Sequence, residues 1–297
     1  MIDYEKRRWL GYEDLHAFLF KIRPVLERAT GRPVYFNWFF RLDWQIEKVY
    51  GDAAWAFNQY GSLIKEAREY GDSLGLHIHA WRPKRIGLQK TWLADFSDQK
   101  WISSCLTLAH RTFIEATQEQ PQLFSFGGHY LSPEVLAQLE SLGFRCDLSM
   151  YPGRPLSQHF VPGEETCGWL PSFLNTPRHA FKPSRQEFSK PGSDSMNLWE
   201  IPVSVGFLKS IHNPQIKEVH KFLLGMPLNQ AQEIIEQNLV LPNPYLLAEI
   251  RSDVRLDTYN QIQFDKTLEY LMHHPLAQTM EFKTVGSYLD QLELATQ

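Results

Sequence analysis

The chain has 297 residues, 43% of them hydrophobic and 22% charged, and its formal net charge at pH 7 is −4. This composition is that of a folded globular protein, and so small a negative charge gives no electrostatic reason to expect nucleic acid or an anionic membrane as a partner. The length fits one large domain, because barrels of alternating strands and helices commonly reach about 250 residues as a single unit.

The N-terminus and the cysteines bear on cellular location. The first residues, MIDYEKRRWLGYEDL, are charged from Asp3 onward and lack the uninterrupted apolar segment of a secretory signal. No run approaches the roughly 20 apolar residues of a membrane span. Cys105, Cys146 and Cys167 are an odd number without a short metal-type spacing, which favours buried thiols in a reducing compartment. We therefore expect a cytoplasmic protein that does not insert into a membrane.

Apolar patterns of the strand and helix types alternate along the first half of the chain. The segment PVYFNWFFRLD (33–43) predicts a fully buried strand, because aromatic and β-branched residues follow one another without alternating polar positions. Apolar residues then recur at helical spacing from Trp55 to Tyr70, and Gly71 ends that pattern. The next predicted strand is LGLHIHAW (74–81).

The same alternation continues to residue 150. We expect a helix over about 95–118, a strand at LFSFGG (123–128), a helix at SPEVLAQLESLG (132–143) and a strand at FRCDLSM (144–150). The second of these helices has the clearest pattern, because Ser132 can cap its N-terminus and Pro133 suits its first position.

Residues 151–197 follow neither pattern. They contain seven prolines and four glycines, and we expect a long Pro/Gly-rich loop insertion. A functional loop over the site and a surface insertion both remain open, although the aromatic residues of the segment favour packing against the rest of the fold.

Regular patterns resume after the loop. They predict strands at LWEIPVSV (198–205), PYLLAEIRSD (244–253) and MEFKTV (280–285), and helices at LNQAQEIIEQNL (228–239), at about 260–273 and at the C-terminus. Seven strands alternating with helices imply a parallel sheet, either closed into a barrel or open and doubly wound. We expect a distorted α/β barrel of about seven parallel strands over residues 1–297, because polar residues gather after several strand ends, where such barrels place their sites.

A metal site is predicted where the first two strands end. Asp43 ends the first strand, and His77 and His79 lie on one side of the second because their positions differ by two. Parallel neighbours bring these ends together, so the three side chains could bind zinc or another divalent ion. In the alternative interpretation, Asp43 pairs with Arg41 or Arg82, and His79 stacks among polar neighbours.

Five segments resemble, in order, the landmarks of the polysaccharide deacetylase (NodB-homology) family. They are FNWFFRLDWQ, LGLHIHAW, FSFGGHYLSPEVLAQLESLGFRCDLSMYP, LWEIPVS and MEFKTVGSYL. The resemblance spans about residues 33–292 and is greatest to cytoplasmic-type branches found with glycan biosynthesis. It implies a barrel of about seven strands that holds a divalent metal by one aspartate and two histidines. It also implies removal of an acetyl group from an N-acetylated sugar by metal-bound water.

Several family motifs are changed in this chain. Where the family has two adjacent aspartates, one for the metal and one as base, this chain has Asp43 followed by Trp44. The family spaces its two histidines by three residues, which puts Trp81 at the later position and leaves His79 to substitute for it.

Two later motifs also differ. The family's third motif supplies an arginine, whereas SFGGHYL has none and contains His129; the late histidine is replaced by Arg251 and Asp253 in LLAEIRSD. Amide hydrolysis needs a base that accepts the water proton; Asp43 is a candidate catalytic residue, and Asp253 or His129 is the candidate base if Asp43 is committed to the metal. It also needs an acid that protonates the departing amine, for which His129 is a candidate.

Other residues are candidates for substrate contact. Trp81 and Arg82 could form a wall for a sugar ring and an anionic group, although Trp81 is equally explained by packing. Glu200 lies in an apolar strand, where a carboxylate must be paired or belong to the site. Arg41 and Arg251 complete the set of expected substrate-binding residues.

Three functions are compatible with these patterns. The first is a metal-dependent hydrolase that deacylates an N-acylated sugar or sugar-like metabolite, with a small sugar or glycan precursor as its partner. The second is an amidohydrolase-type metallohydrolase, which also uses two histidines in this spacing but expects them on the first strand. The third is a barrel that binds a glycan or metabolite without turnover.

Overall fold

The structure is a computed structural model that describes residues 8–86, 89–158, 165–210, 213, 215–252 and 258–295. The chain divides into two compact units. The helical unit comprises Met1–Phe36 and Val203–Tyr288, and the sheet unit comprises Asn37–Pro202 and Leu289–Gln297. The single-domain organisation expected from the sequence stays a prediction.

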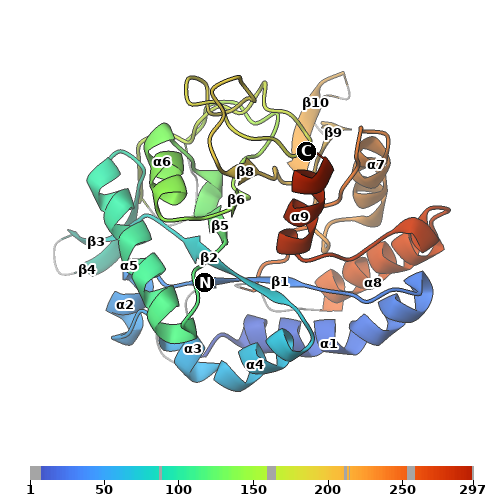
Figure 1. Ribbon diagram of the computed structural model, residues 1–297, viewed down its shortest axis with the longest axis horizontal. Helices are drawn as coiled ribbons and strands as arrows, with labels where there is room; N and C mark the ends of the chain where they lie inside the picture. The colour runs from blue at the N-terminus through green and yellow to red at the C-terminus, as the bar shows by residue number, and fades with distance from the viewer. Residues whose placement is uncertain are drawn as a thin grey trace. The chain divides into compact units, whose positions relative to one another are not determined.

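A parallel sheet forms the centre of the sheet unit (Figure 1). Its strands, in spatial order, are β1 (Asn37–Arg41), β2 (Ser73–Ile78), β5 (Leu123–Phe126), β6 (Cys146–Asp147) and β8 (Trp199–Glu200). Every neighbouring pair is parallel. The α/β class and the parallel sheet are therefore confirmed. A closed barrel of seven strands is not confirmed, because the described residues place five strands in this sheet.

Helices follow these strands in the sheet unit. They are α2 (Trp44–Tyr50), α3 (Trp55–Gln59), α4 (Gly61–Glu69), α5 (Gln99–Thr117) and α6 (Pro133–Ser141). The α5 helix begins later than the sequence indicated, because Asp98 caps it by accepting hydrogen bonds from the backbone N–H groups of Lys100 and Trp101. Ser132 caps α6 as predicted, by accepting the N–H of Val135.

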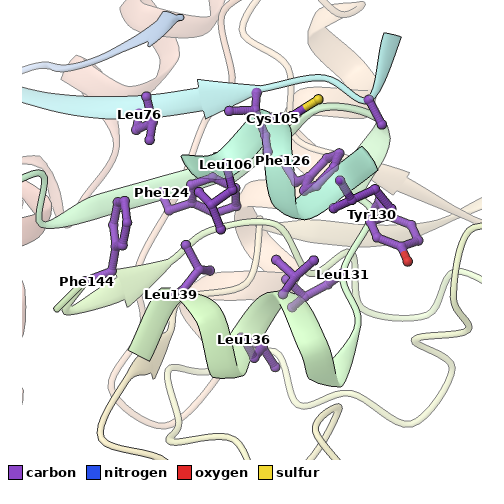
Figure 2. Packing of buried hydrophobic residues seen from close by; sticks show 14 of the residues in the cluster. Leu76, Cys105, Leu106, Phe124, Phe126, Tyr130, Leu131, Leu136, Leu139 and Phe144 are labelled. Carbon is purple, nitrogen blue, oxygen red and sulfur yellow. The ribbon is translucent and has the colours of Figure 1, made fainter. Parts of the chain in front are cut away.

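The core of the sheet unit lies between the strands and these helices. Figure 2 shows Leu139 of α6 directed toward Phe124 of β5, with Leu106 of α5 beside them and Leu76 on β2. All four side chains are fully buried. Burying each such side chain stabilises the fold by about 1.5–3 kcal/mol, so this cluster holds the sheet rigidly under the loops at its carboxyl edge.

A second sheet was not expected from the sequence. It contains the antiparallel hairpin β3 (Trp81–Ile86) and β4 (Gln89–Asp95), with β7 (Glu165–Cys167) parallel to β4.

The 151–197 segment packs against the sheet unit. Leu170, Phe173 and Phe181 are buried in its core cluster. The expectation that the aromatic residues of this loop would pack is confirmed at Phe173 and Phe181, although the described residues of the segment have little regular structure.

The helical unit contains α1 (Leu10–Thr30), α7 (Leu228–Leu239), α8 (Thr258–His273), the short helix η2 (Ala277–Thr279) and the antiparallel hairpin β9 (Val205–Lys209) and β10 (Lys217–Lys221). The α7 helix has the predicted bounds, whereas α1 was not predicted. The last helix, α9 (Val285–Ala295), has residues in both units. Within the described ranges, no helix has both the length and the apolar character needed to cross a membrane.

Two predicted strands are wrong in the described residues. The segments at 244–252 and 280–285 make only the single bridges Leu223↔Glu249 and Val34↔Phe282. In the first, Pro244 lacks the N–H that a ladder needs, and Asn243 before it has φ 50°. In the second, Thr284 accepts the N–H of Ser287 and so begins α9.

Candidate functional site

Asp43 is a fully buried anchor between β1, β2 and α2. Its carboxylate accepts two hydrogen bonds of 2.9 Å from the Arg41 guanidinium. Oδ1 also accepts the N–H of Gln45 at 3.0 Å, which caps α2, and Oδ2 accepts the N–H of His79 at 3.0 Å. The pairing with Arg41 is one of the alternatives that the sequence left open. Four donors on two oxygens satisfy this carboxylate.

His77 and His79 lie together where β2 ends, as alternation along a strand predicts. Their Nε2 atoms are 3.1 Å apart, and their ring centroids are 4.9 Å apart in an edge-to-face arrangement. Two imidazole nitrogens at this distance need one proton between them, so one ring donates and the other accepts. The His79 ring is also stacked with Trp81 at a centroid distance of 6.2 Å.

The turn η1 (Gly127–His129) follows β5 and lies against His79. A Cβ atom at Gly127 would meet Cε1 of the His79 ring at 2.2 Å, so only glycine leaves room for that ring. His129 has φ 57°, a left-handed conformation that is uncommon for a residue with a side chain. Its Nδ1 lies 3.1 Å from the carbonyl oxygen of Ser149, and its ring contacts Tyr151.

Arg154 supports the same turn from the loop after β6. Its Nη1 donates to the Gly128 carbonyl at 2.8 Å, and its Nη2 donates to the His129 carbonyl at 2.6 Å. The guanidinium packs over the Phe173 ring. Burial lowers the pKa of Arg154 to about 10, which still leaves it protonated at neutral pH. Sequence reasoning missed this residue, because nothing in its local spacing separates it from the other basic residues of the loop.

Asp147 and Glu200 form a buried carboxyl pair on two neighbouring strands. They are directly opposite one another on β6 and β8, and both are fully buried. Burial is the main cause that raises the pKa of each group, and for Glu200 the Asp147 charge adds to it. Glu200 was expected to be either paired or part of the site, and it is paired. Asp147 was missed, although it too is an acidic residue in an apolar strand pattern.

The predicted substrate wall is engaged in structural contacts. Trp81 is 6% exposed and belongs to the core. The Arg82 guanidinium donates to Asp98 at 2.6 Å, lies 3.2 Å from Asp95 and packs 5.0 Å from the Trp101 ring centre.

The remaining predicted residues lie elsewhere. Arg251 is exposed and belongs to the helical unit. Asp253, a candidate base, lies outside the described residues.

The donor arrangement does not fit the expected set of three metal ligands. Both Asp43 oxygens are occupied by N–H donors, although the His77 and His79 nitrogens are close enough to share a partner. Among the residues that the structure describes, no three His, Cys, Asp or Glu side chains are arranged to hold a metal ion. Metal binding by Asp43, His77 and His79 stays a prediction, and no chemical step is derived from it below.

Comparisons with known proteins give one kind of match. No sequence profile of a known protein family matches this chain, and no curated protein matches it. Among solved structures, the fold is similar to that of a "putative polysaccharide deacetylase" from Mycobacterium smegmatis. The TM-score is 0.51 at 11% sequence identity, over 97% of this chain and 78% of that chain. The similarity shows a shared α/β fold, which supports the family resemblance at that level.

Proposed function

We propose that this protein is a deacetylase-type hydrolase that removes an acetyl or other acyl group from an N-acylated sugar or sugar-like metabolite. The observation that carries the proposal is the set of histidines at the carboxyl edge of the parallel sheet, with His77 in the last residues of β2, His79 just after β2 and His129 after β5. This edge is where open and closed α/β sheets bind their substrates. The fold similarity to a protein named as a deacetylase supports the same reaction class.

The histidine pair supplies the base in this proposal. The Nε2 atoms of His77 and His79 hold one proton between them. When the hydrogen bond between the rings opens, the lone pair of the nitrogen that accepted it can take a proton from a water molecule that attacks the amide carbonyl. Asp43 fixes the backbone of His79 through its N–H, and Arg41 holds the Asp43 carboxylate in place. The Asp43 carboxylate therefore acts by holding His79 in position and through its charge, because its oxygens have no capacity left for a water proton.

His129 supplies the acid. A backbone carbonyl only accepts hydrogen bonds, so Nδ1 of His129 carries a proton toward Ser149, and Nε2 is the atom that exchanges protons with substrate. The ring acts as the acid in its imidazolium form, which gives the Nε2 proton to the departing nitrogen and returns to the neutral Nδ1–H ring. Protonation of the departing nitrogen prevents expulsion of an unstable amide anion. The missing side chain of Gly127 leaves room for the His79 ring, which brings His79 against the turn that carries His129.

A second candidate function is binding of the same sugar without turnover. The saturation of the Asp43 carboxylate favours it, because the family uses an aspartate at this position directly in the reaction. In this candidate, the histidines would donate hydrogen bonds to sugar hydroxyl or acetamido groups rather than transfer protons.

The test is release of acetate from a panel of free, nucleotide-linked and lipid-linked N-acetylated sugars. Wild type and the control His110→Ala should release acetate at similar rates, because His110 lies on α5, where its side chain contacts Gln120 and Phe144. We expect His79→Ala and His129→Ala to lower the rate by about 10²-fold or more, the usual range for loss of an acid or base. No acetate from any sugar would reject the hydrolase, and binding without release would support the second candidate.

A further inference from the structure

Two carboxyl groups meet in the interior of the sheet unit, at the ends of β6 and β8. Asp147 and Glu200 are each 0% exposed and are partners in the parallel register. Within the described residues, neither carboxyl group forms an ion pair with a basic side chain, and Arg145, two residues before Asp147, pairs with Asp290 at 2.7 Å and Glu293 at 3.1 Å. Two negative charges at this position would therefore lack an ion-pair partner, which a buried site does not tolerate.

The hydrogen bonds show which group carries a proton. Asp147 accepts two hydrogen bonds from Ser149, one from the N–H at 3.0 Å and one from the hydroxyl at 2.6 Å. Glu200 Oε1 accepts only the N–H of Met150 at 3.0 Å, and its buried Oε2 meets no donor. Two fully buried carboxyl groups that are register partners are tolerated only if one of them is protonated, and a proton on Oε2 of Glu200 would make this orphaned atom a donor toward Asp147. The group with fewer donors, Glu200, is therefore the one that gains most from a proton of its own.

Ser149 connects this pair to the turn that carries His129. The Ser149 hydroxyl donates to Asp147 and accepts the N–H of Phe126 at 2.8 Å, the residue before the turn. The Ser149 carbonyl accepts from Nδ1 of His129 at 3.1 Å. Ser149 therefore holds both the residue before the turn, Phe126, and the imidazole of His129, and Asp147 fixes both the N–H and the hydroxyl of Ser149.

We propose that Asp147 and Glu200 share one proton and, through Ser149, act as positioning residues that hold the His129 imidazole in its Nδ1–H tautomer. The neutral ring then has its lone pair on Nε2. What Nε2 does for a substrate rests on the proposed function, whereas the shared proton and the tautomer do not. The left-handed backbone of His129 is consistent with this role, because a strained conformation persists only where the surrounding contacts fix it.

The electrostatic environment supports a neutral Glu200. Burial is the first cause that raises its pKa well above the usual range, and the Asp147 charge is the second. Burial also raises the pKa of Asp147, but the hydrogen bonds from Glu200 and Ser149 oppose that rise. The thiol of Cys146, the other titratable neighbour, is kept neutral mainly by burial.

Ring-nitrogen NMR of ¹⁵N-labelled protein tests the tautomer without any substrate, with the His129 signals assigned from their absence in His129→Gln. Wild type should show a protonated Nδ1 and an unprotonated Nε2 in the neutral ring. Glu200→Gln should keep this pattern, because its amide still donates to Asp147. Glu200→Met and Ser149→Ala should shift the signals toward a mixture of tautomers. Asp72→Asn, a buried carboxylate bonded to Trp38 instead, is the matched control and should leave His129 unchanged.

Two outcomes would overturn the inference: an Nε2–H tautomer in wild type, or an unchanged His129 in both Glu200→Met and Ser149→Ala. If those variants do not fold, infrared difference spectra of wild type and Glu200→Gln test whether Asp147 and Glu200 share a proton. The C=O stretch of a protonated carboxylic acid should be present at neutral pH only in wild type, and its absence there would refute the shared proton. Failure of acetate release with the expected tautomer would reject the proposed function alone.

Discussion

Gly127→Ala is the sharpest perturbation of the candidate site. Gly127 does not have a positive φ, so its backbone conformation suits an L-residue, and the added methyl group acts only through its neighbours. That methyl carbon would lie 2.2 Å from Cε1 and 2.3 Å from Nδ1 and Nε2 of the His79 ring, whereas ordinary contact begins at 3.4 Å. The ring must therefore move by roughly 1 Å, away from its 3.1 Å contact with His77.

Gly127→Ala should destabilise the fold because its methyl group overpacks space that the His79 ring already fills. We expect Gly127→Ala to lower the free energy of unfolding by about 1–3 kcal/mol. His79→Ala removes the clashing ring, so the double variant should recover much of that loss. The double-mutant cycle should give a coupling energy of about 1–2 kcal/mol between the two positions, within the usual range for residues in contact.

Urea denaturation of wild type, the two single variants and the double variant measures the coupling energy of this cycle. The rate of acetate release by the same proteins measures the effect on the candidate site. Gly61→Ala is the control, because a Cβ at Gly61 meets nothing within 4 Å and the residue lies in α4; its stability should change by less than about 1 kcal/mol. Strictly additive costs for Gly127→Ala and His79→Ala would refute the contact between the turn and the imidazole, and with it the geometry proposed for the site.

The remaining predictions concern protonation, metal and packing. Glu200→Gln should cost less than about 1 kcal/mol, whereas Glu200→Met should cost about 3–5 kcal/mol because it leaves the Asp147 charge without its proton donor. In wild type, folded Glu200 keeps its proton above its ordinary pKa of 4.5, so stability should fall as pH rises above 4.5, and Glu200→Gln should flatten that slope in urea titrations at several pH values. His77→Ala should lower the divalent metal content of the purified protein in elemental analysis, and an unchanged content would contradict the predicted metal site. Phe173→Ala should cost about 3–5 kcal/mol in thermal or urea unfolding, whereas the 59% exposed Leu174→Ala should cost little; equal effects would show that the loop does not pack as described.

Local patterns predicted most of the helices of this fold. The bounds of α7 were predicted without error, and the cap of α6 was predicted because Ser132 and Pro133 act within one turn. The β3 and β4 hairpin was not predicted, since RPKRI offers a proline and three basic residues instead of an apolar alternation. The two wrong strands had suitable residues but no partner strand, and pairing is decided by distant parts of the chain.

The candidate site also has some features that local spacing predicts and others that depend on contacts between distant parts of the chain. Spacing alone predicted that His77 and His79 would share one side of a strand. Spacing could not decide whether Asp43 would bind a metal or pair with Arg41, because that choice depends on side-chain directions in three dimensions. The pairing of Asp147 with Glu200 depends on the register between β6 and β8, which no local pattern encodes.

The packing of the 151–197 segment has a consequence for how this chain can diverge. Phe173 is fully buried, whereas Trp169 and Leu174 on either side of it are 55% and 59% exposed. Mutations at the exposed positions leave the anchoring ring in place, so the segment can change its outer chemistry without unfolding the protein. Drift and selection are therefore expected to act on these outward-facing positions first, with the aromatic anchor fixed between them.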